Sequence, residues 1–357
     1  MSLPAEFWSG ALLFIVNIPF SPSNAQYAPS PTLLSVNIDT QGFFSTRTCS
    51  TQPYGTTDTG MSKAVHSMSP QQLQDLALPH KNEQSEISCS FQNVLLINAM
   101  IQTNEEWAAL ISTKVSDVQK AGKPKVTLHV TSPNAEFART IDHTLLKPDA
   151  TPAQIDALCD ETIKFKFKSC CVNGANIPQV TARLAGTSAI PCAVIGFPLG
   201  ASKMEVKAFE ASQAISDGAK EIDMVLNVGA LKAGDYSLVF SDIRAVVLAC
   251  GTTPLKVILE TVFLTDEEII AASFLAANAG ATFVKTCTGF LGGGATARHV
   301  SLMRTAVAFM PGVQVKASAG IRNFEKCVEM LEAGADRIGT SSGVAIMGEG
   351  TSETGTY

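Results

Sequence analysis

A short pattern that occurs three times in the second half of the chain constrains its fold more than any other feature. In each copy an amphipathic segment ends on Gly-Ala, and two residues later an apolar run begins; the copies carry Gly218, Gly280 and Gly334. Glycine readily takes the left-handed conformation in which helices commonly end. Each copy therefore predicts a helix that stops and a strand that follows, and the copies are spaced about two βα units apart.

Eight apolar runs in the same part of the chain predict eight strands. Helical patterns, such as those at 204–216 and 266–278, separate most of them. Near-continuous apolar runs are typical of parallel strands that are buried on both faces. Eight such units over roughly 200 residues match a closed (β/α)8 barrel, the TIM-barrel class of α/β fold. The predicted strands are Ile141 to Leu146, Ser169 to Asn173, Cys192 to Phe197, Glu221 to Asn227, Leu255 to Glu260, Thr282 to Thr288, Val313 to Ser318 and Arg337 to Ser341.

An open, doubly wound sheet is the alternative architecture. Such a sheet is expected to carry a glycine-rich phosphate loop after its first strand. Residues 142–148, with the sequence Asp-His-Thr-Leu-Leu-Lys-Pro, contain no glycine. We therefore favour the barrel, over residues 136–350, with 351–357 as a C-terminal tail.

Residues 1–102 differ from the barrel in composition. The stretch from about 21 to 88 is rich in Ser, Thr, Pro and Gln and has little periodicity, so we expect a largely disordered extension. Residues 103–135 are predicted to flank the barrel, with a helix from Asn104 that stops near Gly122 and a short strand at 125–130. The apolar run at 11–16 is too short to span a bilayer and lacks the positive segment of a signal peptide. Ser23-Asn24-Ala25 after it resembles a cleavage site, so a signal peptide stays the minor alternative to a cytoplasmic location.

Charge and cysteine usage exclude several classes of function. The formal net charge is -6 and no run rich in Lys and Arg is present, which argues against a nucleic-acid partner. The nine cysteines are scattered without a C-x-x-C pair. That pattern favours reduced thiols in a cytoplasmic protein over a disulfide framework or a zinc site. The five histidines show no ligand spacing, so we expect no metal and no other cofactor.

Two lysines stand at matching places in consecutive predicted strands, Lys285 in the sixth and Lys316 in the seventh. A buried charge is costly unless its surroundings use it. Because consecutive strands of a barrel are neighbours, we expect both amines to point into one pocket. Two ammonium groups that close lower the pKa of at least one of them, which leaves a neutral amine able to attack a carbonyl. A single lysine is more often a strand-end residue that reaches water, but the matched pair favours catalysis.

An acid or base is also needed, and Asp223 lies among aliphatic residues of the fourth predicted strand. A lysine across the pocket is one partner for it, and backbone donors are the alternative. Asp142 and Glu260 are second-rank candidates that order the lysines or react in place of Asp223. Lys256, near the start of the fifth strand, is predicted to lie at the opposite face of the barrel in a solvated, structural role.

Two segments rich in small residues predict an anion site. One follows the seventh strand and contains Gly320 and Arg322, and the other follows the eighth and contains Gly339, Ser341 and Ser342. In barrels these two loops and a short extra helix commonly hold phosphate. Small residues let backbone N–H groups approach the oxygens, and Arg322 adds charge. Ordinary tight turns are the alternative. The glycines at 292–294 fit a mobile substrate loop or a flexible linker equally well.

Several of these segments together resemble deoxyribose-phosphate aldolase, a class I aldolase with a barrel fold. They are Ile141-Asp142-His143-Thr144-Leu145-Leu146-Lys147, Glu221-Ile222-Asp223, Val284-Lys285-Thr286 and Val315-Lys316-Ala317-Ser318. The resemblance covers roughly the last 220 residues. Cys287 stands where the family commonly has serine, and Ala319 where it commonly has glycine.

The resemblance implies reversible cleavage of 2-deoxy-D-ribose 5-phosphate to glyceraldehyde 3-phosphate and acetaldehyde, without a metal. It implies that Lys285 forms the Schiff base, that Lys316 lowers the pKa of Lys285 and that Asp223 relays protons. Tyr357 resembles the terminal tyrosine that family members fold towards the active site. The Gly-Ile-Arg and Gly-Thr-Ser-Ser segments match the family's phosphate site.

Two other functions remain open from the residues alone. One is a metal-dependent aldolase or isomerase on the same barrel, which the unpatterned histidines disfavour. The other is a barrel that binds a phosphorylated metabolite without catalysis, which the paired lysines disfavour. Barrels of this kind often form homodimers, and we include that assembly among the expectations, together with the absence of a membrane partner.

Overall fold

The computed structural model describes residues 12–15, 33–38, 44–49, 103–122, 124 and 130–348. The chain divides into two units, Met1–Leu78 and Pro79–Tyr357. The first unit contains a three-stranded antiparallel sheet of β1 (Leu12–Ile15), β2 (Leu33–Ile38) and β3 (Phe44–Cys49). These short strands fall within the extension that was expected to be largely disordered. Its remaining residues lie outside the described part of the chain.

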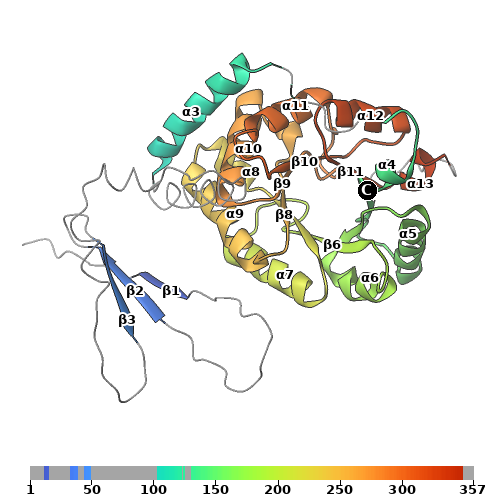
Figure 1. Ribbon diagram of the computed structural model, residues 1–357, viewed down its shortest axis with the longest axis horizontal. Helices are drawn as coiled ribbons and strands as arrows, with labels where there is room; N and C mark the ends of the chain where they lie inside the picture. Colours follow the sequence, from blue (N-terminus) through green and yellow to red (C-terminus); the bar gives the residue numbers. More distant parts are fainter. Residues whose placement is uncertain are drawn as a thin grey trace, which may run out of the picture. The chain divides into compact units, whose positions relative to one another are not determined.

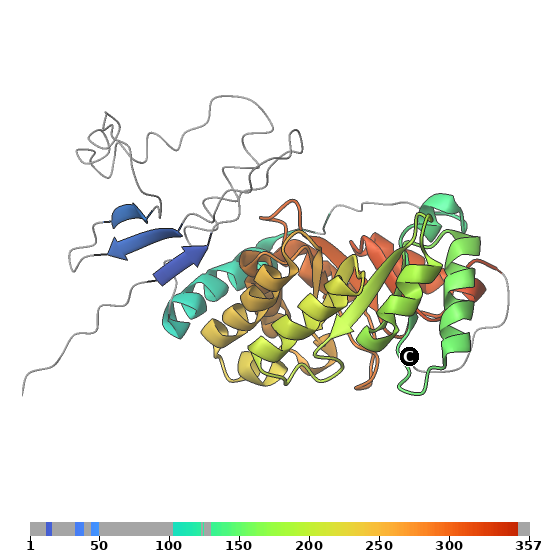
Figure 2. The same cartoon turned by 90° about the horizontal axis from the view of Figure 1, so that it is seen from below.

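The second unit holds a closed barrel of eight parallel strands, as predicted, and the open sheet is excluded. Around the barrel the order is β4-β5-β6-β7-β8-β9-β10-β11, with β11 pairing back to β4. The helices form the outer layer in both views (Figure 1, Figure 2). The strands are β4 (Ile141–Leu145), β5 (Ser169–Asn173), β6 (Ile190–Ile195), β7 (Glu221–Val225), β8 (Leu255–Ile258), β9 (Phe283–Lys285), β10 (Gln314–Ser318) and β11 (Arg337–Thr340).

The helices alternate with the strands along the chain. Thr151 and Thr265 open two of them with capping boxes, in which the threonine hydroxyl and a side chain three residues later satisfy free N–H groups. The helices of the barrel are α4 (Ala135–Ala138), α5 (Pro152–Phe165), α6 (Ile177–Arg183), α7 (Met204–Ser216), α8 (Val228–Lys232), α9 (Tyr236–Cys250), α10 (Asp266–Ala279), α11 (Ala297–Ala306), α12 (Phe324–Glu332) and α13 (Gly343–Ile346). Short 3-10 turns follow β5 (Gly174–Asn176) and β8 (Thr261–Phe263).

The three glycines of the recurring pattern take the backbone conformation for which they were singled out. Gly218, Gly280 and Gly334 have φ values of 111°, 98° and 110°. Each follows a helix, α7, α10 or α12, and precedes an inner strand. A side chain at Gly218 would also lie 2.4 Å from the Thr181 hydroxyl, so close packing adds a second requirement for glycine there.

The predicted flanking helix is present as α3 (Asn104–Lys120), which begins with a capping box at Thr103. Its Trp107 side chain is buried and contacts the rings of Phe240 and Phe274, at centroid distances of 5.0 and 6.3 Å. α3 therefore packs on the outside of the barrel, against α9, α10 and α11. The strand expected at 125–130 falls mostly on residues 125–129, outside the described part of the chain. Within that part, no helix combines the length and apolar character that crossing a bilayer requires.

Candidate active site

The carboxylate of Asp223 lies at the centre of the barrel and contacts three lysine amines. Its Oδ2 atom accepts hydrogen bonds from Lys285 and Lys316, each at 2.8 Å, and its Oδ1 atom accepts one from Lys256 at 2.7 Å. All four side chains are buried, with Lys285 3% exposed and the others fully enclosed. One carboxylate thus holds three ammonium groups close together, away from bulk water.

The strand register explains why the amines meet. Lys285 and Lys316 are direct partners in the β9–β10 pair, so their side chains start at the same height on the inner face. The expectation that both point into one pocket is confirmed, because they share a single oxygen of Asp223. Asp223 reaches them across the barrel from β7, two strands away from β9.

The expectation that Lys256 is solvated is wrong. It lies directly beside Asp223 in the β7–β8 pair, its side chain is fully buried, and its amine is 2.6 Å from Glu221 Oε2 as well as 2.7 Å from Asp223. The position of Lys256 near the start of its strand indicated the end of the barrel opposite the C-terminal ends of the strands. The side chain nevertheless faces inward, and its length carries the amine up to the Asp223 carboxylate.

A second carboxylate, Asp142 on β4, extends the cluster. Its Oδ2 atom is 2.6 Å from Lys316 Nζ, and its Oδ1 atom accepts hydrogen bonds from Arg337 at 2.8 Å and from Ser169 at 2.7 Å. Arg337 also donates to Glu221 at 3.0 Å, which links this carboxylate back to Lys256. Asp142 therefore orders a lysine, one of the two roles considered for it.

The charges of the cluster set the pKa values of its members. Burial alone raises the pKa of Asp223, but the Lys256, Lys285 and Lys316 charges together hold it well below its ordinary value. The pKa of Asp142 is lowered in the same way, against burial, by Arg337 and Lys316. Burial works against the charged form of Lys316, yet Asp142 and Asp223 raise its pKa well above the usual value. Both aspartates are thus carboxylates and Lys316 is an ammonium ion near neutral pH.

The cluster holds more positive than negative charge. Lys256, Lys285, Lys316 and Arg337 face the three acidic groups Asp142, Glu221 and Asp223, so full ionisation leaves one positive charge uncompensated. Among the described residues, Lys256 and Lys316 each contact two carboxylates, whereas Lys285 contacts only Asp223. Lys285 is therefore the amine with the fewest carboxylate contacts, and it is also the most accessible of the three.

The loops after β10 and β11, where an anion site was expected, are tied together. Thr340 Oγ1 donates to the carbonyl of Ile321 at 2.7 Å and accepts from the backbone N–H of Ser342 at 2.9 Å. Ala319 and Gly320 have φ values of 79° and 74°. This left-handed conformation strains Ala319, which explains why glycine suits that position better.

Gly339 is needed for a reason that the sequence did not indicate. A Cβ atom there would lie 2.9 Å from both Lys316 Cε and Ser318 Cβ, so the absent side chain leaves room for the lysine. Gly294 has a similar role beside the neighbouring loop, where a Cβ atom would lie 2.9 Å from the carbonyl oxygen of Ala319. This glycine packs closely against the β10 loop and is more than a linker.

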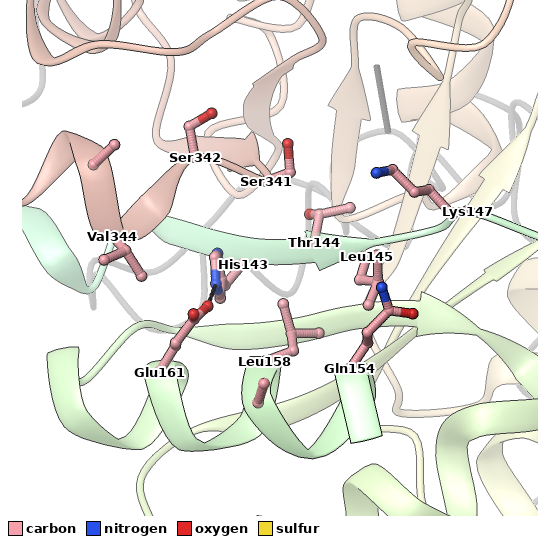
Figure 3. Close-up of a pocket in the computed structure, with 12 residues that line it drawn as sticks. His143, Thr144, Leu145, Lys147, Gln154, Leu158, Glu161, Ser341, Ser342 and Val344 are labelled. Atoms are coloured by element: carbon pink, nitrogen blue, oxygen red, sulfur yellow. Dashed lines mark hydrogen bonds and ion pairs between the residues drawn. The ribbon is translucent and has the colours of Figure 1, made fainter. Parts of the chain in front are cut away.

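A pocket of about 430 Å³ opens beside these loops, between β4, α5 and α13 (Figure 3). Ser341, Ser342, Thr144 and Lys147 are among the residues that line it. Figure 3 shows the Lys147 amine and the Ser341 hydroxyl on the same side of β4. Lys147 thus borders the same pocket as Ser341 and Ser342, two of the residues expected to bind an anion.

Comparison with known proteins follows this geometry. A family model for DeoC/LacD family aldolases matches residues 137–348, which is more than half of the chain and the whole ring of strands. The chain belongs to the DeoC/LacD aldolase family. The match begins at the helix before β4 and ends just after α13, so the three strands of the N-terminal unit and α3 lie outside it.

Similar proteins cover the same part. The deoxyribose-phosphate aldolase of Exiguobacterium sibiricum is 54% identical over 219 residues, 61% of this chain and 98% of that protein. Deoxyribose-phosphate aldolase 1 of Staphylococcus aureus is 54% identical over 212 residues, 59% of this chain and 96% of its own. A solved structure from Coccidioides immitis has a TM-score of 0.64 at 43% identity, covering 69% of this chain and 97% of that one. The tetrameric deoxyribose phosphate aldolase of Aeropyrum pernix has a TM-score of 0.56 at 33% identity, covering 60% and 91%.

Among the described residues, neither Arg322 nor Glu260 forms an ion pair with a lysine of the cluster. Arg322 is exposed on the loop after β10. Glu260 takes a left-handed conformation with φ 57° and accepts a 2.5 Å hydrogen bond from the Thr288 hydroxyl, so it joins the ends of β8 and β9. Burial raises the pKa of Glu260. Tyr357 lies outside the described residues.

Within the described residues, one set of side chains has the spacing of a metal site. Cys171, Cys192 and Asp223 offer ligand atoms within 4.8 Å of one another. Both oxygens of this aspartate, however, already bind lysine ammonium groups, and a cation placed there would be repelled by three positive charges at short range. The donor set does not suit a metal ion. The two thiols were missed from the sequence because Cys192 was read only as part of an apolar strand.

Proposed function

We propose that the barrel catalyses the reversible cleavage of 2-deoxy-D-ribose 5-phosphate to D-glyceraldehyde 3-phosphate and acetaldehyde through a Schiff base on Lys285. The observation that carries the proposal is the buried amine of Lys285, which shares one oxygen of Asp223 with the ammonium group of Lys316. Relatives named deoxyribose-phosphate aldolase, 54% identical over the barrel, support the choice of substrate.

The chemistry begins when the neutral amine of Lys285 attacks the aldehyde carbon of the open-chain sugar. Loss of water gives an imine, which withdraws electrons from the neighbouring carbons. The bond between C2 and C3 then breaks as the C3 hydroxyl gives up its proton. Glyceraldehyde 3-phosphate leaves, and the two-carbon fragment remains on Lys285 as an enamine. Protonation of the enamine carbon and addition of water release acetaldehyde and the free amine.

Asp223 and Lys316 supply the groups that this sequence requires. Asp223 stays ionised because the lysine charges hold its pKa low, so its carboxylate stabilises the positive imine. Its contacts with the lysines support a role in relaying protons among them. Lys316 stays charged because its pKa is raised, and its ammonium group 2.8 Å from the shared oxygen favours the neutral form of a neighbouring amine. Lys316 therefore acts on the nucleophile through its charge.

The phosphate group is proposed to bind at the loops after β10 and β11. Backbone N–H groups near Gly320, the hydroxyls of Ser341 and Ser342 and the charge of Arg322 are the donors, and Gly339 keeps the lysine chamber open beside them. The position of Ser341 and Ser342 on the rim of the described pocket supports this assignment. Lys147, which lines the same pocket, is available to add a second positive charge.

Borohydride trapping tests the nucleophile. Reduction in the presence of 2-deoxyribose 5-phosphate or acetaldehyde converts the imine to a stable secondary amine, which mass spectrometry locates by peptide. We expect the adduct on Lys285 and turnover that is unchanged by exhaustive chelation with EDTA. An adduct on a different lysine, with Lys285 unmodified, contradicts the assignment, and loss of turnover on chelation contradicts the metal-free chemistry.

The two ends of the chain give further proposals. Tyr357 is proposed to reach the active site and to transfer the proton to the enamine carbon; Tyr357→Phe is then expected to slow that step while leaving borohydride trapping intact. Residues 1–102 are proposed to be dispensable for catalysis. A shortened chain that begins at Thr103 keeps the capped helix α3 with its buried Trp107, and we expect it to turn over substrate at the full-length rate.

The cellular setting and the assembly are also proposals. The seven cysteines of the barrel, from Cys159 to Cys327, are free thiols, which supports a cytoplasmic location. A homodimer is proposed because α7 exposes the large apolar side chains of Val206 and Phe209, 53% and 66% accessible, one turn apart. Light scattering of the wild type and of Phe209→Glu tests the dimer: a monomeric mass for the wild type contradicts it.

A further inference from the structure

Two cysteine thiols face each other inside the barrel, beside the lysine cluster, and the aldol chemistry uses neither. Cys171 on β5 and Cys192 on β6 are direct partners in the strand register, and both are fully buried. Their sulfur atoms and an oxygen of Asp223 all lie within 4.8 Å of one another. Cys192 Sγ is 3.2 Å from Asp223 Oδ1 and 3.4 Å from Lys256 Nζ.

We propose that Cys171 and Cys192 form a peroxide-sensitive dithiol that oxidises to a disulfide and thereby switches off the lysine cluster. Neighbouring strands are about 4.8 Å apart, within the range of Cα separations that disulfides span. Side chains on the inner face of a barrel converge towards its axis, which brings the two sulfur atoms closer than their backbones. The bond requires only a small inward movement of the two side chains.

The surroundings favour reaction at Cys171. The hydrogen bond between the two thiols lowers the pKa of Cys171, and the Lys316 and Lys285 charges act in the same direction against burial. Burial raises the pKa of Cys192. A thiolate beside ammonium groups is the reactive form of cysteine. Cys171 is therefore the attacking sulfur, and Cys192 is the thiol that resolves the product.

Each step balances. The Cys171 thiolate attacks one oxygen of hydrogen peroxide and breaks the O–O bond, which gives a sulfenic acid and hydroxide; the hydroxide takes up a proton to become water. The Cys192 sulfur then attacks the sulfenic sulfur, loses its own proton and displaces a second water. In total two thiols lose two electrons and two protons, and one peroxide is reduced to two waters.

Access to the thiols rests on the proposed function. Phe197 and Phe290 pack over Cys171 and Cys192, with their rings edge to face at 5.1 Å, and separate them from solvent. A chamber that admits an aldehyde to Lys285 also admits hydrogen peroxide, which is smaller. Oxidation removes a hydrogen-bonding thiol from beside Asp223 Oδ1, the oxygen that holds Lys256.

The chain contains a matched control. Cys159 on α5 and Cys170 on β5 are also fully buried, with sulfur atoms 4.0 Å apart, but they lie on the outer side of β5. Cys170 is 3.1 Å from the Thr162 hydroxyl, and the hydrogen bond between the two thiols raises the pKa of Cys170 and lowers that of Cys159, as in the inner pair. The outer pair differs in its place, outside the barrel and away from the chamber that would admit peroxide. We expect this outer pair to stay reduced under conditions that oxidise the inner pair.

The test treats the full-length protein with hydrogen peroxide, blocks remaining thiols with N-ethylmaleimide and digests without reduction. We expect a cross-linked peptide pair that joins Cys171 to Cys192, two hydrogens lighter than the separate peptides and abolished by dithiothreitol. Because Cys170 shares a peptide with Cys171, the same digest of Cys170→Ala must retain the link. A link through Cys159 or Cys170, or no link in the folded protein, overturns the proposal.

Activity supplies the second readout. Peroxide is expected to lower turnover of 2-deoxyribose 5-phosphate at least tenfold, with recovery on addition of dithiothreitol. The turnover of Cys171→Ala is expected to be the same before and after peroxide treatment. Cys159→Ala should lose as large a fraction of its turnover as the wild type does. Equal sensitivity of Cys171→Ala and wild type overturns the link to catalysis. If no variant turns over this sugar, the proposed function fails, and the peptide analysis still decides the disulfide.

Discussion

Buried lysines lie on both sides of β7, three on the inner side and one on the outer side. On the inner side, Lys256, Lys285 and Lys316 surround Asp223. On the outer side, Lys207 from α7 is equally buried, and its amine donates to Asp242 at 2.7 Å and to the carbonyl of Val225 at 3.0 Å. Both sites hold buried lysine amines, yet we assign a catalytic role to the inner site and only a structural role to the outer one.

The difference is in the charge balance. Lys207 meets one carboxylate and one carbonyl oxygen, so its charge is compensated and its amine has its hydrogen-bond partners. The inner lysines together with Arg337 outnumber the carboxylates around them. A buried lysine is therefore weak evidence for catalysis, whereas a buried excess of positive charge makes a neutral amine favourable. Variants on the two sides of β7 can distinguish the effect of a buried lysine from the effect of a buried excess of positive charge.

The largest effect is expected for Lys285→Met, which removes the nucleophile from the inner cluster. Aldol turnover should fall by about three orders of magnitude or more, because no other amine there is both accessible and bound by one carboxylate. The cluster loses its excess charge, so the unfolding midpoint in urea should change little or rise. Steady-state rates with 2-deoxyribose 5-phosphate, together with urea unfolding, measure both. Retention of more than a tenth of the wild-type rate would place the nucleophile elsewhere.

Asp223→Asn should come next, with large losses of both activity and stability. Removing this charge leaves three ammonium groups with fewer carboxylates, and breaking a buried ion pair from one side typically costs about 3–5 kcal/mol. We expect a matching drop in the free energy of unfolding. The double variant Asp223→Asn/Lys256→Met removes one surplus charge and should regain part of that stability without regaining turnover. No gain in the double variant would mean that Lys256 is not held by Asp223.

The two sides of β7 also show how far the sequence alone can go. The matched positions of Lys285 and Lys316 were sufficient to predict a shared pocket, because parallel strands that follow one another are neighbours in a barrel. The prediction for Lys256 was wrong because it rested on the position of the residue along the strand and not on the inward direction of its side chain. Its register with Asp223 depends on how far each strand is shifted against the next, which no local pattern records.

Other contacts of the site depend on distances between segments far apart in the chain. The fit of Lys316 over Gly339 and the approach of Cys192 to Asp223 arise only after the barrel closes. Lys207 lies on the helix predicted at 204–216, and its burial follows from the way α7 and α9 pack together. The recurring glycines were predictable in detail because their conformation is a local property.

Lys207→Met tests the outer site and should have a smaller effect, on stability alone. The variant leaves Asp242 without its ammonium partner, at a cost of about 3 kcal/mol, while the inner cluster is untouched. The protein that remains folded should show kcat within about twofold of wild type, since Lys207 contacts only the outer side of β7. Urea unfolding and kcat per folded molecule check this. A tenfold loss of kcat with normal stability would show that the outer site also positions the catalytic strand.

The smallest effect is expected in the pH dependence of stability, where the two sites should have opposite signs. The pKa of Asp142 is lowered from 3.8 in the folded chain, chiefly by Arg337 and Lys316 against burial, so its contribution is present above pH 3.8 and is lost as the pH falls through the lowered value. The pKa of Asp242 is raised from 3.8 by burial. Its contribution is present below pH 3.8 and is lost as the pH rises through the raised value. Unfolding free energies measured in urea on both sides of pH 3.8 should therefore fall less steeply with acid in Asp142→Asn than in wild type. They should fall more steeply in Asp242→Asn. Equal slopes in the two variants would show that these carboxylates do not differ as their surroundings imply.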